Sequence, residues 1–214
     1  MWLIPIEILL AYLIGAIPTA VWIGKIFYHT DIRTQGSGNA GATNTIRVLG
    51  YKAGIPVLLF DIFKGWLAVQ VVHFFPQDAF TPDMINYIRI GLALAAVLGH
   101  IFPVYAGFHG GKGVSTLAGV AIALYPLSLL IVLGVFIVTL VLSHYVSLSS
   151  IVASLVFPFA VIFITGQQNP GLVILSILVA IFIPVTHRKN IVRLLKGKEN
   201  KFDFKRRKEE ERKS

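Results

Sequence analysis

Long apolar runs separated by short polar segments dominate the chain from its start to about residue 186. A helix that crosses the hydrocarbon core of a bilayer needs roughly 20 mostly apolar residues. The pattern therefore predicts seven transmembrane helices. Their expected ranges are 2–27, 53–75, 87–105, 114–127, 128–146, 151–165 and 171–186.

The number of spans depends mainly on the stretch 114–146. Tyr125-Pro126 divides this stretch, because proline lacks a backbone N–H and clashes with the preceding turn of a helix. If the stretch were instead one kinked unit, six spans would result, which is the main alternative. The segments 114–127 and 151–165 are also short for a full crossing.

The composition supports a membrane protein. The 214 residues are 56% hydrophobic and only 14% charged, whereas soluble domains are about 25% charged. Cysteine is absent, which excludes disulfides, a thiol nucleophile and thiolate metal sites. We predict an all-α, polytopic integral membrane protein with a helical bundle over 1–198 and a charged cytoplasmic tail over 199–214.

The positive charges predict the orientation. Lys and Arg concentrate in the segments 30–52, 106–113 and 187–214, the last of which holds twelve of them, whereas 76–86 and 166–170 hold none. Positively charged loops remain in the cytoplasm. The N-terminus is therefore expected outside and the C-terminus in the cytoplasm, which agrees with an odd number of spans.

A glycine-rich polar segment over residues 33–47 follows the first predicted span. Exposed N–H groups in such a loop can form a concavity that binds anions, and the planar guanidinium of arginine matches phosphate oxygens. We therefore expect a phosphate site here. Its candidate ligands are Ser37, Gly38, Asn39, Thr43, Asn44 and Arg47.

A second glycine-rich segment surrounds Lys112 with Gly110, Gly111 and Gly113, directly before an apolar helix. The N-terminus of a helix offers unpaired N–H groups and the positive end of its dipole to a phosphate. The segment is not a nucleotide-binding P-loop, because Ala106 takes the place of its first glycine and Gly113 that of its Ser or Thr. We predict a second phosphate contact centred on Lys112.

Two further polar segments follow on the same predicted face. Residues 143–150 are expected to be a short polar return, in which most serines cap helix ends and one or two contact substrate. In the segment 187–199, helical spacing would place His187, Asn190 and Arg193 on one face. A histidine at this position can act as an acid, a base or a hydrogen-bond donor near neutral pH.

Carboxylates are scarce on the predicted cytoplasmic face, and none lies within the two glycine-rich segments. A magnesium site usually needs carboxylates close to the phosphate. We therefore expect phosphate to be held by N–H groups, Lys and Arg without a metal or another cofactor, and we expect no nucleic acid partner. Asp61 and Lys64 are spaced to pair inside the membrane, where such a pair is either functional or structural.

These segments resemble three motifs of one enzyme family. Gly36-Ser37-Gly38-Asn39 with Gly41-Ala42-Thr43-Asn44, Arg47 and Gly50 is similar to the first motif of the acyl-phosphate-dependent glycerol-3-phosphate acyltransferases, the PlsY family. Gly99-His100-x-Phe102-Pro103 followed by residues 110–114 resembles the second. Residues 187–199 resemble the third, and His109 departs from the pattern where a basic residue is expected.

The resemblance implies a bacterial inner-membrane enzyme with seven helices and a cytoplasmic active site. It would move an acyl group from acyl phosphate to the sn-1 hydroxyl of glycerol 3-phosphate, giving lysophosphatidate and phosphate, as the first step of phospholipid synthesis. Ser37, Gly38, Asn39, Thr43 and Gly110 to Gly113 would hold the acyl-phosphate head. Arg47, Lys112, Ser150, His187 and Asn190 would hold glycerol 3-phosphate, and Glu199 would order the third motif.

Two groups could take the proton of the attacking hydroxyl. One is His187; the other is the phosphate of the donor, since the second pKa of a phosphate monoester is about 6. We favour the donor phosphate, with His187 and Asn190 orienting the acceptor and Lys112 stabilising the leaving phosphate. The main alternative function is a small permease for a phosphorylated solute, although transporters usually place their ionisable groups at mid-membrane.

Overall fold

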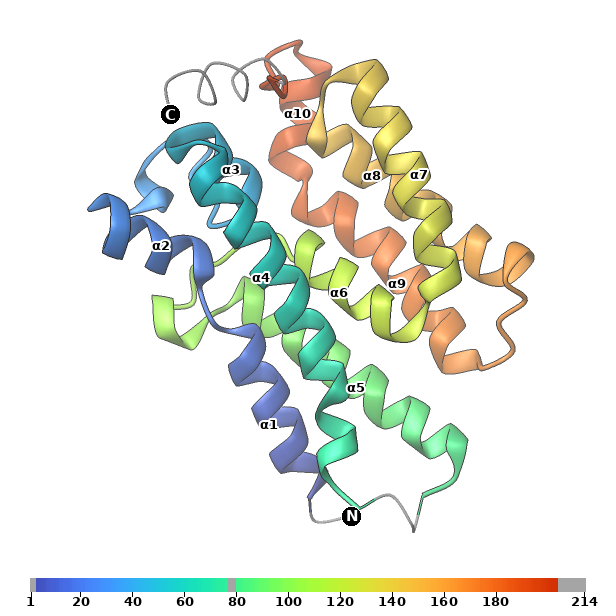
Figure 1. Ribbon diagram of the computed structural model, residues 1–214. Helices are drawn as coiled ribbons and strands as arrows, with labels where there is room; N and C mark the ends of the chain where they lie inside the picture. Colours follow the sequence, from blue (N-terminus) through green and yellow to red (C-terminus); the bar gives the residue numbers. More distant parts are fainter. Residues whose placement is uncertain (1–2, 77–79, 204–214) are drawn as a thin grey trace. The chain divides into compact units, whose positions relative to one another are not determined.

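The computed structural model describes residues 3–76 and 80–203, which form helices joined by short turns (Figure 1). No β-strand occurs among these residues, so the all-helical prediction is confirmed. The chain divides into two compact units, Met1–Ala123 and Leu124–Lys205, and each is described by itself. Residues 204–214, which make up most of the predicted tail, lie outside the described residues. The division into a bundle and a tail therefore stays a prediction.

Unit 1 contains the helices from the N-terminus to α6. They are α1 (Ile4–Gly15), α2 (Thr19–Tyr28), η1 (Ile32–Thr34), α3 (Ala42–Leu49), α4 (Tyr51–Gln70), η2 (Val71–Phe74), α5 (Pro82–Ile101), η3 (Val104–Ala106) and nearly all of α6 (Val114–Leu124). Thr81 begins α5 by accepting a hydrogen bond from the Met84 N–H, and Pro82 follows it at the first helical position, where proline costs nothing.

The first predicted span, 2–27, corresponds to an apolar segment over Ile4–Tyr28 that is long enough to cross a membrane. It is not one continuous helix, which corrects that part of the prediction. The helix α1 ends at Gly15 and α2 begins at Thr19. Pro18 brings no N–H and disfavours the helical conformation for Ile17. The Ile17 carbonyl, which loses its helical partner, accepts a hydrogen bond of 2.8 Å from the Lys64 ammonium.

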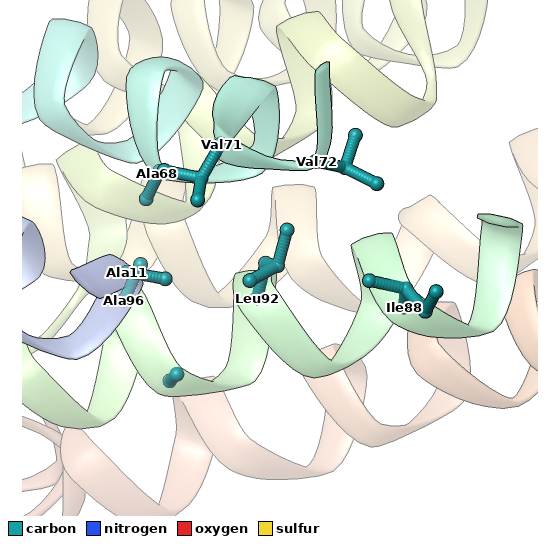
Figure 2. Close-up of a cluster of buried hydrophobic side chains, with 8 residues drawn as sticks. Ala11, Ala68, Val71, Val72, Ile88, Leu92 and Ala96 are labelled. Carbon is teal, nitrogen blue, oxygen red and sulfur yellow. The ribbon is translucent and has the colours of Figure 1, made fainter. Parts of the chain in front are cut away.

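The core of unit 1 lies where α1, α4 and α5 pack together. Small side chains fill much of it, including Ala11 of α1, Ala68 of α4 and Ala96 of α5, all of them fully buried. Figure 2 shows Ala68 and Val71 on one side of this cluster and Leu92 on the other. Small residues let helix backbones approach closely, which is the main source of helix association in a membrane.

Unit 2 contains the remaining helices. They are α7 (Pro126–Ser143), α8 (Val146–Phe159), η4 (Ala160–Ile164), α9 (Pro170–Thr186) and α10 (Arg188–Leu195). Pro126 is the first residue of α7, so the predicted division at Tyr125-Pro126 is confirmed. Asn169 caps α9 by accepting a hydrogen bond from the Leu172 N–H.

The predicted polar return over residues 143–150 is wrong in its extent. Only His144 and Tyr145 separate α7 from α8, and the serines that follow are helical. Ser149 and Ser150 donate their hydroxyl hydrogen bonds to the carbonyls of Tyr145 and Val146, one turn back. A serine that satisfies itself in this way is tolerated inside a helix, so the polar pattern does not interrupt α8.

The described residues hold five helical segments long and apolar enough to cross a membrane, or six if α9 and α10, bent by 60° at their junction, count as one span. The segment α8 with η4 has 19 residues and is longer than predicted. The helix α6 has 11 residues, too few for a full crossing by itself. An integral membrane helical protein is thus supported, while seven spans and the orientation of the termini stay predictions.

Candidate active site

The first glycine-rich segment of unit 1 is built around the side-chain amide of Asn44, which is only 1% exposed. Its Oδ1 accepts a hydrogen bond of 2.8 Å from the Ser37 N–H. Its Nδ2 donates to the carbonyls of Ile32 and Gln35, each at 3.1 Å. The Arg47 guanidinium donates to the same Oδ1 at 3.4 Å. Asn44 therefore holds the loop in one shape and brings Arg47 close to Ser37.

We expect Asn44→Ala to destabilise unit 1 by about 1–3 kcal/mol, because backbone groups that pair with the amide become unsatisfied. The loss would appear as a lower melting temperature and as faster amide hydrogen exchange over residues 32–44. Asn44→Asp, which keeps the acceptor for Ser37 but removes the donor, should protect the Ser37 amide better than alanine does. Unchanged exchange in the alanine variant would contradict this account.

Arg33 connects the two glycine-rich segments of unit 1. Its guanidinium forms a salt bridge of 2.7 Å with Asp31 and donates a hydrogen bond of 2.8 Å to the Ala106 carbonyl. The hydrogen bonds from Arg33 are the main reason why the pKa of Asp31 lies well below its ordinary value. Asp31 is thus an ionised carboxylate whose charge is compensated by Arg33 and by Lys25, 3.3 Å away.

The second glycine-rich segment lies against the end of α5. The Gly110 N–H donates to the Ile101 carbonyl at 3.0 Å, and the Gly111 N–H donates to the His100 carbonyl at 3.1 Å. A side-chain carbon at Gly111 would lie 2.2 Å from the His100 Nε2, so any larger residue there would displace the His100 ring. Lys112 follows in a half-buried position, directly before the start of α6.

In unit 2, His187 lies at the junction between α9 and α10 and is 4% exposed. Its Nδ1 lies 2.9 Å from the Ile183 carbonyl and 3.2 Å from the Thr186 hydroxyl. A carbonyl oxygen only accepts hydrogen bonds, so the neutral ring carries its proton on Nδ1. Nε2 is then the nitrogen with the lone pair, which is the arrangement required of a base or acceptor.

The Glu199 carboxylate accepts hydrogen bonds from three side chains within unit 2. Its side chain is 5% exposed. Its Oε1 accepts from the Asn190 amide at 2.7 Å and from the Ser147 hydroxyl at 3.1 Å. Its Oε2 accepts from the Arg193 guanidinium at 2.7 Å. Asn190 and Arg193 thus lie on one face of α10, as the spacing predicted, and Glu199 closes the segment over that face.

The charge of Glu199 is part of this arrangement. Burial by itself raises the pKa of the carboxyl, but the hydrogen bonds from Arg193, Asn190 and Ser147 outweigh it, and the pKa lies below its ordinary value of 4.5. Because the pKa is lower in the folded protein, the ionised carboxyl stabilises the folded state at pH values above its ordinary pKa. This stabilisation is lost as the pH falls through the lowered pKa.

We therefore expect Glu199→Gln to lower the stability at neutral pH by about 1–3 kcal/mol, because an amide cannot accept all the hydrogen bonds of the carboxylate. The difference between the two proteins should shrink below pH 4.5. Thermal melting between neutral and acidic pH would measure both. A difference that stays constant over this range would show that the charge of Glu199 does not contribute.

The predicted site residues fall into two sets. Unit 1 connects Ser37 and Arg47 through Asn44, and unit 2 connects Asn190 to Glu199. Ser150 bonds to its own helix, and its assignment to substrate stays a prediction, as do the roles given to Gly38, Asn39, Thr43 and Gly113.

Sequence reasoning missed the roles of Arg33 and Ser147, whose partners are distant in the chain. Arg33 bonds to a carbonyl 73 residues away, and Ser147 bonds to a carboxylate 52 residues away.

In the described part of the chain no group of three or more His, Cys, Asp or Glu side chains is arranged to hold a metal. The metal-free reaction stays a prediction.

Comparison with known proteins places this geometry in context. A profile described as glycerol-3-phosphate acyltransferase matches residues 6–197. Proteins of that name from Chlorobaculum tepidum and Staphylococcus carnosus are 46% and 45% identical, covering 92% and 94% of this chain and 95% and 99% of their own.

A solved structure is also similar to the chain. It is the glycerol 3-phosphate form of PlsY, an integral membrane glycerol 3-phosphate acyltransferase, and it matches with a TM-score of 0.82 at 36% identity. The match covers 94% of this chain and 96% of the other. The lysophosphatidic acid form of the same protein matches with a TM-score of 0.78 at 35% identity, over 95% of this chain and 97% of the other.

Proposed function

The chain belongs to the glycerol-3-phosphate acyltransferase family of membrane proteins, and from this membership we propose that it transfers a fatty acyl group from acyl phosphate to the sn-1 hydroxyl of glycerol 3-phosphate. The products are lysophosphatidate and inorganic phosphate. The related solved structures have glycerol 3-phosphate and lysophosphatidic acid forms, which are the acceptor and the product of this reaction.

The observation that carries the proposal is the state of the carboxylates beside the motif segments. Asp31 is paired with Arg33 and Glu199 with Arg193, each at 2.7 Å, and Asp61 is paired with Lys64 at 2.8 Å. Acyl phosphate and glycerol 3-phosphate are both dianions at neutral pH. A site for two dianions needs cations and N–H donors without competing negative charge, and the pairing of these carboxylates supplies that condition.

The proposal assigns roles to each unit separately. In unit 1, Ser37, Gly38, Asn39, Thr43 and the glycines around Lys112 bind the acyl-phosphate head. Arg47 and Lys112 contact glycerol 3-phosphate, and Lys112 also stabilises the leaving phosphate. In unit 2, His187 and Asn190 orient glycerol 3-phosphate, with Ser150 as a further contact. The buried hydrogen bonds of Asn190 and of the His187 Nδ1 support this assignment, because they fix both side chains before substrate arrives.

The reaction is a direct acyl transfer. The sn-1 oxygen of glycerol 3-phosphate attacks the carbonyl carbon of acyl phosphate, and the bond between that carbon and the phosphate oxygen breaks. The phosphate leaves with the bonding electron pair while Lys112 stabilises its charge. The hydroxyl proton passes to an oxygen of the departing phosphate, while His187 and Asn190 hold the acceptor in line. No covalent enzyme intermediate and no metal ion take part.

We further propose seven spans, an outer N-terminus, a cytoplasmic C-terminus and a location in the bacterial inner membrane. The distribution of Lys and Arg supports this orientation. It places the glycine-rich segments on the side where glycerol 3-phosphate is dissolved. The acyl chain of the donor can then remain among apolar helices while its head reaches the interface.

The test is a donor comparison with the purified chain in lipid nanodiscs. Glycerol 3-phosphate is supplied with either palmitoyl phosphate or palmitoyl-CoA, each with and without EDTA, and the products are analysed by mass spectrometry and NMR. We expect 1-acyl lysophosphatidate from palmitoyl phosphate alone, with the same rate in EDTA. Activity with the thioester alone, loss of activity in EDTA, or acylation at sn-2 would each contradict a stated part of the proposal.

A further inference from the structure

A cluster of buried polar side chains lies in unit 1, next to the second glycine-rich segment. Asp61 and Lys64 of α4 form a salt bridge of 2.8 Å, and each side chain is only 2% exposed. The Thr19 hydroxyl donates to Asp61 at 3.2 Å. The His100 Nδ1 lies 3.8 Å from the same carboxylate oxygen. Burying charges within a membrane-spanning bundle is costly, so this group requires an explanation beyond packing.

His100 holds the loop that carries Lys112 on both sides. Before Lys112, the His100 carbonyl accepts the Gly111 N–H, and the ring edge lies directly against Gly111. After Lys112, the His100 Nδ1 hydrogen bonds at 3.0 Å to the hydroxyl of Thr116, in the first turn of α6. His100 therefore hydrogen bonds to the chain on both sides of Lys112, at Gly111 before it and at Thr116 after it.

The surroundings of Thr116 keep the second attachment in place. Thr116 is fully buried. A side-chain carbon at Gly65 of α4 would lie 2.1 Å from the Thr116 carbonyl oxygen, which shows how closely α4 and α6 approach there. Asp61 and Lys64 belong to the same turns of α4, so this helix supports both the ring of His100 and the start of α6.

We propose that His100 and Thr116 are positioning residues that hold the chain on both sides of Lys112 and so place its ammonium for the reaction, with the buried Asp61–Lys64 pair packed beside the His100 ring. The inference rests on the proposed function, because Lys112 receives its role only there. His100 and Thr116 act through the loop and do not contact the reacting atoms. Their loss displaces the lysine, and a displacement of about 1 Å near the chemistry can cost on the order of 100-fold in rate.

The test compares two substitutions of Thr116. Thr116→Val keeps the volume and removes the hydroxyl, whereas Thr116→Ser keeps the hydroxyl and removes a methyl group. We expect the valine variant to lose about tenfold or more in kcat/KM and the serine variant to stay within about twofold of the unmodified chain. A role in packing alone predicts the opposite order, so that order would overturn the inference.

A double-mutant cycle with Lys112→Ala separates positioning from general damage. If the hydroxyl of Thr116 acts through Lys112, Thr116→Val should cost almost nothing once the lysine is absent. Equal losses in both backgrounds would overturn the inference. Product is quantified by mass spectrometry at raised protein concentration, because the alanine background is slow.

A substitute variant and a control variant complete the test. If Thr116→Val fails to fold, the cycle is repeated with His100→Asn, which can retain a hydrogen bond to Thr116 and removes the ring edge from Gly111. The exposed His109, in the same loop, provides the control, and His109→Ala should leave kcat/KM within about twofold. If the unmodified chain formed no lysophosphatidate, the proposed function would fail; a normal rate with equal losses in both backgrounds would overturn the inference alone.

Discussion

Replacing Lys112 with alanine should lower kcat/KM by about 100- to 1000-fold, which is the typical cost of removing one preorganised group that stabilises developing charge. The leaving phosphate gains negative charge as its bond to the acyl carbon breaks. Lys112 is half-buried and attached to the end of α5 and the start of α6 through its neighbours. The backbone that carries Lys112 is therefore already fixed before substrate binds, which is the condition for a preorganised charge.

The fold should tolerate this change, because Lys112 lies in a loop and does not fill the core. Lys52→Ala is the matched control, since it removes the same charge from an exposed position in unit 1, and its kcat/KM should stay within about twofold. Lys112→Arg keeps the charge but not the point geometry, so we expect an intermediate rate. Steady-state kinetics with palmitoyl phosphate provide the measurement, and a near-normal rate for the alanine variant would remove Lys112 from the mechanism.

The elements that sequence reasoning located correctly have local signals. Tyr125-Pro126 marks the start of α7, and the apolar runs mark the helices, because proline geometry and hydropathy act over a few neighbouring residues. The break between α1 and α2 was not predicted, although Pro18 is present. Its stabilising partner, Lys64, lies 47 residues from Ile17, and no local pattern reveals such a partner.

The same contrast between local signals and distant partners holds for the candidate site. The motif segments were predicted, because glycine, lysine and arginine cluster there in the sequence. The sequence pattern did not predict which polar side chains hydrogen bond to these segments and hold them in place. Ser147 and Ser150 have the same chemistry, yet Ser147 bonds to Glu199 whereas Ser150 bonds to its own helix. Only the direction in which each residue faces on α8 distinguishes them, and that depends on tertiary packing.

Replacing His187 is the second large effect that we expect. His187→Ala should lower kcat/KM by about 100-fold or more, within the range measured for groups that act on a proton or orient its donor. His187→Gln should lose less, because its amide can still hydrogen bond to the acceptor. The two variants therefore measure how much of the effect depends on a hydrogen bond and how much on the imidazole.

The pH profile then identifies the base. If the donor phosphate takes the proton, the rate rises as that phosphate loses its last proton, at a pKa below the value of about 6 of a phosphate monoester, because the acyl group withdraws electrons from the phosphate. This ascending limb belongs to the substrate, so it should persist in His187→Gln at a lower plateau. If His187 is the base, the limb belongs to the imidazole and disappears with it. We expect the limb to persist, because the sequence of bond changes delivers the proton most directly to the departing phosphate, and its loss in the glutamine variant would assign the proton transfer to His187.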